Sequence, residues 1–481
     1  MSETSPGTSP IRAAAVQFDM QVGIDNKAKN VARTSSSMHT SRFRYFIFAL
    51  LITMALINYI DRGAIAFAAE PITSEFGFDK VAWGNVLGFF GYGYMFGALI
   101  GGWLADNIGP RRVWLWAGAA WSVLEIASAF SGEIGIGLFA GSALAGFGLV
   151  RILFGFAEGP AYSTINRTMA DWAAPRERGL AVSLGLLSTP LGALLSAPIS
   201  VGLLVFTDSW RTTFIILGLL GMVWLAVFAV FFRNTPEEHP KVTPSELAHI
   251  RGEGDDWSPE VPATPGTRVP TRAFFTSRTL LLNSVGYFSF MFVNFTILTW
   301  VPKYLQEEFG YSLSSLWYLG MIPWTGACFT ILLGGRISDL LRARTGNLRI
   351  ARNAVAVISM AATALCFVSI PLVNGPVAVL ALMTLGNALN SLPNSVFWSV
   401  IIDTAPSRAG TFGGFTHFIA NIAAVLAPVL AGILAQRYGY GSIFYGAVGA
   451  TVLGMSAMIF VRPGDLGGKW NAVERKPVTV G

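Results

Sequence analysis

Four charged residues lie inside long apolar segments of the sequence. Asp61 and Arg62 are adjacent in one segment, and Arg151 and Glu158 are seven positions apart in another. A charge at the centre of a bilayer helix costs about 2.5–3.5 kcal/mol on insertion scales. These side chains must therefore face one another, a polar cavity, or both.

Helical spacing predicts how the four side chains are directed. Arg151 and Glu158 are separated by nearly two helical turns, so we expect them to line one face of their helix. Asp61 and Arg62 are neighbours and diverge by about 100°. One of them can face a cavity while the other reaches a neighbouring helix.

This charged cluster fits either a functional or a purely structural interpretation. Arginine presents a planar fork of donors that suits a carboxylate. Acids in a low-dielectric site can take up a proton near neutral pH, and protonation would release an arginine for an anionic ligand. The alternative is an internal ion-pair cluster that only fixes helix packing.

The second half of the chain carries neutral polar groups in its apolar segments. They are Asn294, Asn387, Asn390, Asn394, Ser395, Trp398, His417 and Asn421. Such groups could recognise the hydroxyls of a ligand, although any one of them could equally form a helix–helix hydrogen bond. His417 is the only histidine in an apolar segment, and a packed role is as plausible as ligand contact.

Composition identifies the elements that position these residues as membrane helices. Of 481 residues, 53% are hydrophobic and 12% charged, against about 25% charged in soluble domains. Mean hydropathy is +0.55. These values exclude most soluble folds, a disordered chain and a nucleic-acid binder, and the alternating pattern of a membrane barrel is absent.

Twelve apolar segments are long enough to span a bilayer. They lie near 44–72, 81–105, 112–131, 136–168, 178–206, 211–233, 279–305, 313–340, 352–372, 376–403, 410–436 and 441–462. We predict an all-α membrane protein with two six-helix bundles, 41–233 and 279–462. Residues 1–40 predict a disordered tail without a signal peptide, and 463–481 a cytoplasmic tail.

A Pro- and charge-rich central loop, 234–278, separates the two bundles. Within it, Thr243 followed by Pro244 and Glu246 predicts a capped short helix. Four of the 33 basic residues (Lys80, Arg211, Lys303 and Arg437) fall in predicted outer loops and two within spans. The remaining 27 lie on the other side, which predicts that both termini are cytoplasmic.

The two halves resemble each other in their loops. The loop motif after the second span consists of Gly102, Asp106, Gly109, Arg111 and Arg112. After the eighth span comes Asp339, which lies 233 positions after Asp106. Asp171-Trp-Ala-Ala-Pro175 and Asp403-Thr-Ala-Pro406 follow the fourth and tenth spans. A duplicated six-helix unit explains the shared offset. An Asp and an Arg here could pair while the bundles are joined and separate when they part.

The stretch from Gly102 to Arg112 resembles the loop signature of the major facilitator superfamily. Asn58-Tyr-Ile-Asp-Arg62 and the pair Arg151 and Glu158 resemble motifs of its anion:cation symporter family. Thr299-Trp-Val-Pro302 and Asp403-Thr-Ala-Pro406 are similar in particular to the bacterial galactonate, glucarate and hexuronate transporters. That resemblance implies proton-coupling roles for Asp61 and Glu158. It implies substrate contacts for Arg62, Arg151, Tyr59, Tyr94, Ser395, Trp398, His417 and Asn421. His417 replaces an asparagine of the galactonate carrier, and Gly159 an alanine usual in these members.

The sequence therefore predicts a proton-coupled symporter that imports an organic anion, such as a sugar acid, by alternating access. It is expected to be a monomer in the inner membrane, to bind no nucleic acid and not to be an enzyme. Another carboxylate substrate, an exporter of the same superfamily and a ligand sensor are the alternatives. No cofactor is expected, because a GxxxxGK[ST] motif is absent, and no metal site, because His and Cys lack metal-ligand spacing.

Overall fold

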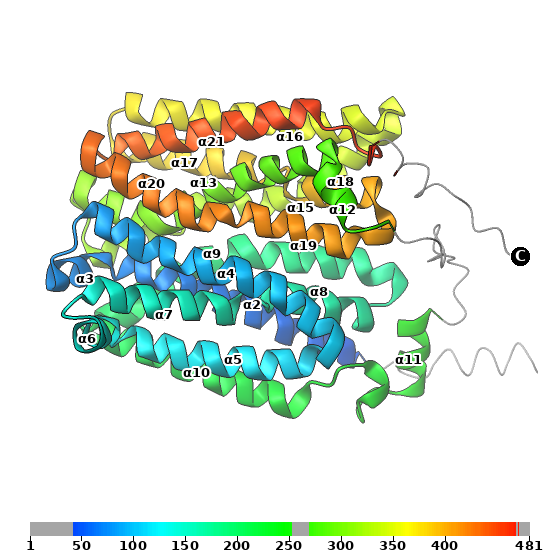
Figure 1. The fold of residues 1–481 in the computed structure, drawn as a ribbon, viewed down its shortest axis with the longest axis horizontal. Coiled ribbons are helices and arrows are strands. Elements are labelled where there is room, and N and C mark those ends of the chain that lie inside the picture. Colours follow the sequence, from blue (N-terminus) through cyan, green and yellow to red (C-terminus); the bar gives the residue numbers. More distant parts are fainter. Residues whose placement is uncertain (1–41, 253–268, 468–469, 471–481) are drawn as a thin grey trace, which may run out of the picture.

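The computed structural model describes residues 42–252, 269–467 and 470, and every regular element in those ranges is helical. The long helices run side by side along one direction (Figure 1). Eleven of them, some as broken pairs, are long and apolar enough to cross a bilayer, and a bent pair, α5 and α6, brings the number to twelve. Residues 1–41, 253–268, 468–469 and 471–481 lie outside the described residues. They include the predicted tail 1–40 and parts of the predicted central loop and C-terminal tail.

The spans of the first half are α2 (Phe43–Phe67), α4 (Lys80–Ile108), α5 (Pro110–Ser128) with α6 (Ser131–Leu138), α7 (Ala143–Glu158) with α8 (Ala161–Trp172), α9 (Arg178–Thr207) and α10 (Trp210–Phe231). Those of the second half are α13 (Arg278–Phe309), α14 (Leu316–Leu319) with α15 (Ile322–Thr345), α16 (Leu348–Ser369), α17 (Pro376–Ser391) with α18 (Asn394–Thr404), α19 (Ala409–Ala420) with α20 (Ile422–Tyr438), and α21 (Gly441–Phe460). Short helices α3 (Ala69–Phe76), α11 (Pro244–Arg251) and α12 (Arg272–Thr276) lie at the ends, α3 and α6 at one end of the bundle and α11 and α12 at the other (Figure 1).

Two predicted spans have different limits in the structure. The first ends at Phe67, and α3 follows it as a separate helix. The predicted span 136–168 is wrong at its start, because α6 is bent by 80° from α5 and α7 begins only at Ala143. Ala140 and Gly141 have positive φ between these helices, a conformation that ends a right-handed helix.

The broken spans repeat between the halves. Pro160 precedes α8 and Pro393 precedes α18, 233 positions later. A proline cannot donate the helical hydrogen bond at its own position, which interrupts each span there. Nearly the same offset separates the paired loop residues, so the duplication extends into the helices.

Glycines set the contact between α4 and α7. A Cβ on Gly93 would lie 1.8 Å from the carbonyl oxygen of Ile152, and one on Gly155 would lie 2.2 Å from that of Phe90. The two backbones touch directly, as small residues spaced by four allow in membrane helices. This close packing places Tyr94 of α4 beside the charged face of α7.

The halves meet along α4 and α20. Cβ atoms built on Gly84, Gly88 and Gly91 would lie within 3.0 Å of α20 atoms. These glycines occupy the half of α4 that is nearer to α3. The closest helix contacts between the two halves therefore lie toward the α3 end of the molecule.

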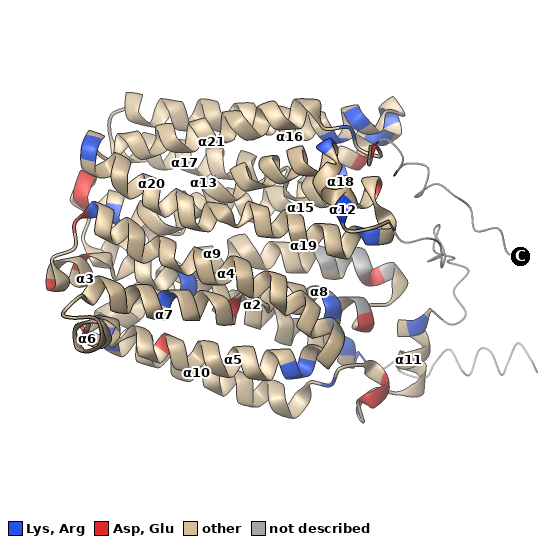
Figure 2. Cartoon of the chain, in the orientation of Figure 1, with Lys and Arg blue, Asp and Glu red and all other residues tan. Residues whose placement is uncertain are grey.

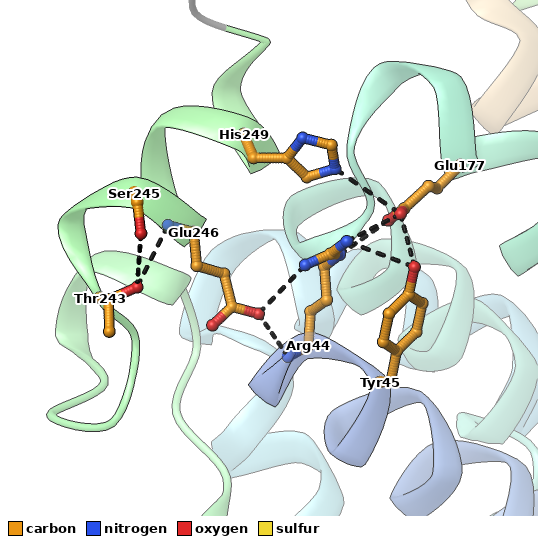
Figure 3. Close-up of polar contacts among 7 residues, drawn as sticks. All are labelled: Arg44, Tyr45, Glu177, Thr243, Ser245, Glu246 and His249. Carbon is orange, nitrogen blue, oxygen red and sulfur yellow. Dashed lines mark hydrogen bonds and ion pairs between the residues drawn. The ribbon is translucent and has the colours of Figure 1, made fainter. Parts of the chain in front are cut away.

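The helix expected after Thr243 is α11, and the Thr243 side chain accepts from the Glu246 amide. The Glu246 side chain does not complete the expected capping box. It instead accepts from the Arg44 amide at 3.0 Å and from Arg44 Nη1 at 3.3 Å (Figure 3). Arg44 also forms two 2.8 Å bonds to Glu177, so one arginine ties α2, the loop after α8 and α11 together.

Candidate functional site

Charged residues concentrate at the two ends of the helical bundle, and a few lie on the helices of the first half between those ends (Figure 2). Arg62 of α2 is only 3% exposed. Its Nη2 donates to Asn58 Oδ1 at 3.0 Å and to Glu158 Oε2 at 3.1 Å. The four-residue spacing of Asn58 and Arg62 on α2 makes the first of these bonds possible.

Aromatic rings surround the Arg62 guanidinium. Its central carbon lies 4.3 Å from the ring centroid of Tyr94, 4.7 Å from that of Phe90 and 4.9 Å from that of Tyr59. Ring faces attract a cation and replace part of its lost hydration. Arg62, Tyr59, Tyr94 and Glu158 therefore form one group, built from α2, α4 and α7.

Asp61 points away from this group, as its position next to Arg62 requires. Its Oδ2 accepts from Trp121 Nε1 of α5 at 2.8 Å, while Oδ1 has no hydrogen-bond partner among the described residues. Asp61 nevertheless lies within electrostatic range of Glu158 and Arg151. The adjacent residues Asp61 and Arg62 thus connect α2 to α5 and α7 respectively.

Arg151 of α7 is buried without an ion pair. Its Nε and Nη1 have no hydrogen-bond partner in the described part of the chain. Its guanidinium lies 5.1 Å from the ring centroid of Phe154 and 5.4 Å from that of Phe90. Arg151 is therefore a desolvated cation whose donors are available to an anion.

Sequence reasoning missed Glu125, a fully buried acid of α5 (0% exposed). It lies within electrostatic range of Asp61, Arg151 and Glu158. The only indication of this site in the sequence was a single glutamate inside the predicted span 112–131. It lay about 9 Å from the predicted end, at 1.5 Å per residue, where an acid could reach the membrane surface.

The second half contributes an aromatic group that includes His417. Tyr287, Trp398 and His417 have ring centroids 5.9–6.3 Å apart, and His417 lies within electrostatic range of Arg62. Both ring nitrogens of His417 are buried without a hydrogen-bond partner among the residues described. His417 is thus the member of this aromatic group that is electrostatically related to Arg62 of the first half.

Ser395 and Asn421 are less closely connected to this group. Ser395 packs against Gly335 of α15, where a Cβ would lie 3.3 Å from its Oγ. Asn421 donates to the carbonyl oxygen of His417 at 2.8 Å and so braces the backbone of that histidine. Asn387 and Asn390 donate to the carbonyl oxygens of Pro323 and Phe290 on other helices, as the helix-bonding alternative expects.

The described residues of the loop motif contact helices of their own half, and the expected Asp–Arg pairing while the bundles are joined stays a prediction. Arg111 donates to Asn234 and to the carbonyl oxygens of Phe232 and Ala229, all in its own half or just beyond it. Asp339 accepts from Arg352 at 2.9 Å within the second half. Gly102 lies in α4, Gly109 links α4 to α5 with a φ of 86°, Arg112 is exposed, and the Asp106 side chain is not described.

Polar contacts between the halves occur at the α3 end. Lys303 was expected in an outer loop but lies within α13, only 5% exposed. Its Nζ lies 2.8 Å from Glu307 and 3.7 Å from Glu70 of the other half. Lys80 of α4 pairs with Glu307 at 3.2 Å, so these four residues bridge the halves.

The arrangement offers anion-binding and proton-binding groups, and no metal-binding set of three or more His, Cys, Asp or Glu is found in the described ranges. Two buried arginines can hold an acidic ligand. Three buried acids beside them can exchange protons. Aromatic rings of the first half surround the Arg62 guanidinium, and His417 of the second half lies within electrostatic range of it.

Comparisons with known proteins agree with the predicted fold. The family model of the Major Facilitator Superfamily matches residues 51–428. A probable sulfoacetate transporter of Cupriavidus necator is 31% identical over 422 residues, which cover 87% of this chain and 94% of that protein. The hexuronate transporter of Bacillus subtilis is 29% identical, with the same coverage.

A solved structure shares the fold. It is a bacterial homologue of the human lysosomal transporter Spinster in an inward-facing and occupied conformation. The TM-score is 0.68, at 15% identity, over 88% of this chain and 97% of that one. At this identity the similarity concerns the fold alone.

Proposed function

Because this chain belongs to the Major Facilitator Superfamily, a family of transporters and not enzymes, we propose that it is a proton-coupled symporter of a small organic anion. It is a multi-pass membrane protein with twelve predicted spans. The observation that carries the proposal is Arg62, a buried guanidinium that is paired with Glu158 and lies within electrostatic range of His417 of the other half.

The substrate follows from the chemistry of the site and from the relatives. Sulfoacetate and hexuronates, named for two relatives, are both small organic anions. Arg62 and Arg151 would hold the acidic group of the substrate. The rest of the substrate would be contacted or braced by Tyr59, Tyr94, Ser395, Trp398, His417 and Asn421. A sugar acid is the substrate class that we propose.

Coupling would use the exchange of partners around Glu158. When Glu158 is ionised it occupies Arg62 through the 3.1 Å bond. A proton on Glu158 cancels that charge and frees the Arg62 donors for the substrate. Asp61, held by Trp121, is the second coupling acid. Substrate and proton would therefore bind together, as symport requires.

The distribution of basic residues indicates how the protein is oriented in the membrane. We assign the α11 end to the cytoplasm, because most basic residues lie in segments predicted there. Both termini are then cytoplasmic, and the protein would work as a monomer in the inner membrane. The ion pairs of Lys303 and Lys80 would close the outer side, with the loop motif acting as the cytoplasmic gate region.

Binding can be tested first, by thermal unfolding of the purified protein with aldonates, aldarates, hexuronates, sulfoacetate and aromatic acids. A bound ligand raises the apparent stability by mass action, by about 2.7 kcal/mol at 100 times its dissociation constant. Arg62→Gln and Arg151→Gln should lose the shift. Binding that persists in both variants contradicts the arginine-clamp proposal.

Coupling can be tested by uptake into proteoliposomes. With an acidic exterior, the wild-type protein should accumulate the ligand found in the panel, and a protonophore should stop accumulation. Uptake that is indifferent to both would refute symport while leaving anion binding intact.

A further inference from the structure

Glu125 is an acid that the proposed coupling mechanism does not use. It lies within α5, and both of its carboxylate oxygens lack a hydrogen-bond partner among the described residues. An unpaired charge in such a place costs several kcal/mol after relaxation. A carboxyl that served only to pack α5 against its neighbours would gain nothing from its charge.

The charges around Glu125 come from two neighbouring helices. They are Asp61 of α2 and Arg151 and Glu158 of α7. The other elements packed against α5 have their charges elsewhere: Lys80 and Asp106 near the ends of α4, Arg167 and Asp171 of α8, and Arg211 in the first turn of α10. On α5 itself, Arg111 and Arg112 are in the first turn. Glu125 therefore responds chiefly to Asp61, Arg151 and Glu158.

The same face of α5 serves two acids. Trp121 precedes Glu125 by four residues, about one turn, and donates to Asp61. Glu125 is thus presented toward the Asp61 side of the cluster. Glu125 and Arg151 are within electrostatic range, yet no ion pair within 4.0 Å joins them in the part of the chain described. Each is a buried charged group without a direct partner.

The charge balance of the cluster indicates what Glu125 does. Three acids (Asp61, Glu125 and Glu158) accompany two arginines, so the fully ionised cluster carries one net negative charge and disfavours an anion. Two bound protons change this to one net positive charge. A singly charged anion then makes the cluster neutral, which is the form least costly to bury.

We propose that Glu125 is a third proton-binding carboxyl of the transport cycle, alternating between a protonated form and an ionised form paired with Arg151. This inference rests on the proposed symport. Protonation adds one proton to a Glu125 oxygen and releases Arg151 toward the substrate. Deprotonation returns that proton to water and restores the attraction to Arg151. Exchange at Glu125 then adds one proton per anion to the protons carried by the other coupling acids.

The first test uses pH alone and needs no ligand. Infrared difference spectra of the full chain in lipid, recorded between acidic and alkaline pH, report the carbonyl stretch of protonated buried carboxyls. Glu125→Gln should remove one such titrating band, and Glu308→Gln, at an exposed position of α13, should remove none. Identical bands in wild type and Glu125→Gln overturn the proposal. If Glu125→Gln does not assemble, Glu125→Asp should displace the band, and an undisplaced band overturns the proposal.

The second test counts protons per substrate in proteoliposomes supplied with D-glucuronate or sulfoacetate. Glu125→Gln should carry one proton fewer per anion than wild type, while Glu308→Gln matches wild type. An unchanged ratio overturns the role of Glu125. Absence of proton entry in wild type itself contradicts the proposed symport instead, so the two failures are distinguishable.

Discussion

Arg62 shows why a particular residue type is needed at the centre of the site. Its planar guanidinium bonds Asn58 and Glu158 and lies over three rings. Lysine carries the same charge but as a compact, strongly hydrated ammonium without a fork. Geometry as well as charge therefore holds Arg62 in place.

Arg62→Lys should weaken binding of the panel ligand by at least about tenfold, which corresponds to about 1.4 kcal/mol. The reason is loss of the fork and of stacking, since the charge is kept. Calorimetric titration measures the effect, with Arg342→Lys at an exposed position of α15 as the control. Equal affinity in Arg62→Lys and wild type would mean that charge alone suffices.

Residue directions were partly readable from the sequence. Adjacent positions on a helix diverge, so Asp61 and Arg62 were expected to meet different neighbours, and they meet Trp121 and Glu158. The identity of those neighbours could not be read, because it depends on which helices pack together. The contacts of Lys303 with Glu70, and the charged neighbours of Glu125, were likewise not readable, because they come from other helices.

At the scale of elements, direct backbone contact between α4 and α7 positions the site. Gly155 is the α7 glycine with the closest approach to α4, because a Cβ there would lie 2.2 Å from the carbonyl oxygen of Phe90. A methyl group there must separate the helices. Tyr94 and Phe90 would then move away from the Arg62 guanidinium.

Gly155→Ala should lower the free energy of unfolding by about 1–3 kcal/mol through overpacking and weaken ligand binding as well. Gly202→Ala in α9 is the matched control, because nothing lies within 4 Å of its built Cβ. Denaturation in one detergent measures both variants. A Gly155→Ala protein as stable as the Gly202→Ala protein would show that α4 and α7 separate at no cost.

Arg44 of α2 bonds both Glu246 of α11 and Glu177 in the loop after α8 (Figure 3). Hydrogen bonds from Arg44 lower the pKa of Glu177 from 4.5 to about 2. A lowered folded-state pKa stabilises the fold above the unfolded value. This contribution is complete above about pH 5 and is lost as pH falls toward 2.

Glu177→Gln should therefore be less stable than wild type near neutral pH, and the difference should shrink steadily below about pH 4.5. Chemical denaturation of both proteins across that range measures it. A stability difference that stays constant with pH would show that the Glu177 charge contributes nothing.

At the scale of the whole molecule, ion pairs join the two halves at the α3 end. Lys303 and Lys80 pair there with Glu70 and Glu307. Alternating access requires contacts at one end to break as those at the other form. These ion pairs would therefore stabilise the state that is closed at the α3 end.

Lys303→Gln should shift the population away from that closed state by about fivefold, equivalent to about 1 kcal/mol. Spin labels at the exposed positions Leu138 and Tyr438, one in each half, would report longer distances in a background without Cys328 and Cys366. Unchanged distances would show that the ion pairs do not hold the halves together.

The overall architecture was largely predictable, because a duplicated six-helix unit leaves a constant offset in the sequence. The 233-residue offset recurs in Pro160 and Pro393, which interrupt corresponding spans. The bend between α5 and α6 was not predictable from hydropathy, because both pieces are apolar. The state of closure was not predictable either, since it depends on ion pairs between distant positions.

The central claim is that a buried acid–arginine cluster couples protons to an organic anion. Its most direct test records internal pH and substrate entry together in wild-type proteoliposomes supplied with D-glucuronate or sulfoacetate. The account predicts internal acidification that begins only when the anion is added and that is lost in Arg62→Gln. Anion entry without any acidification would contradict it.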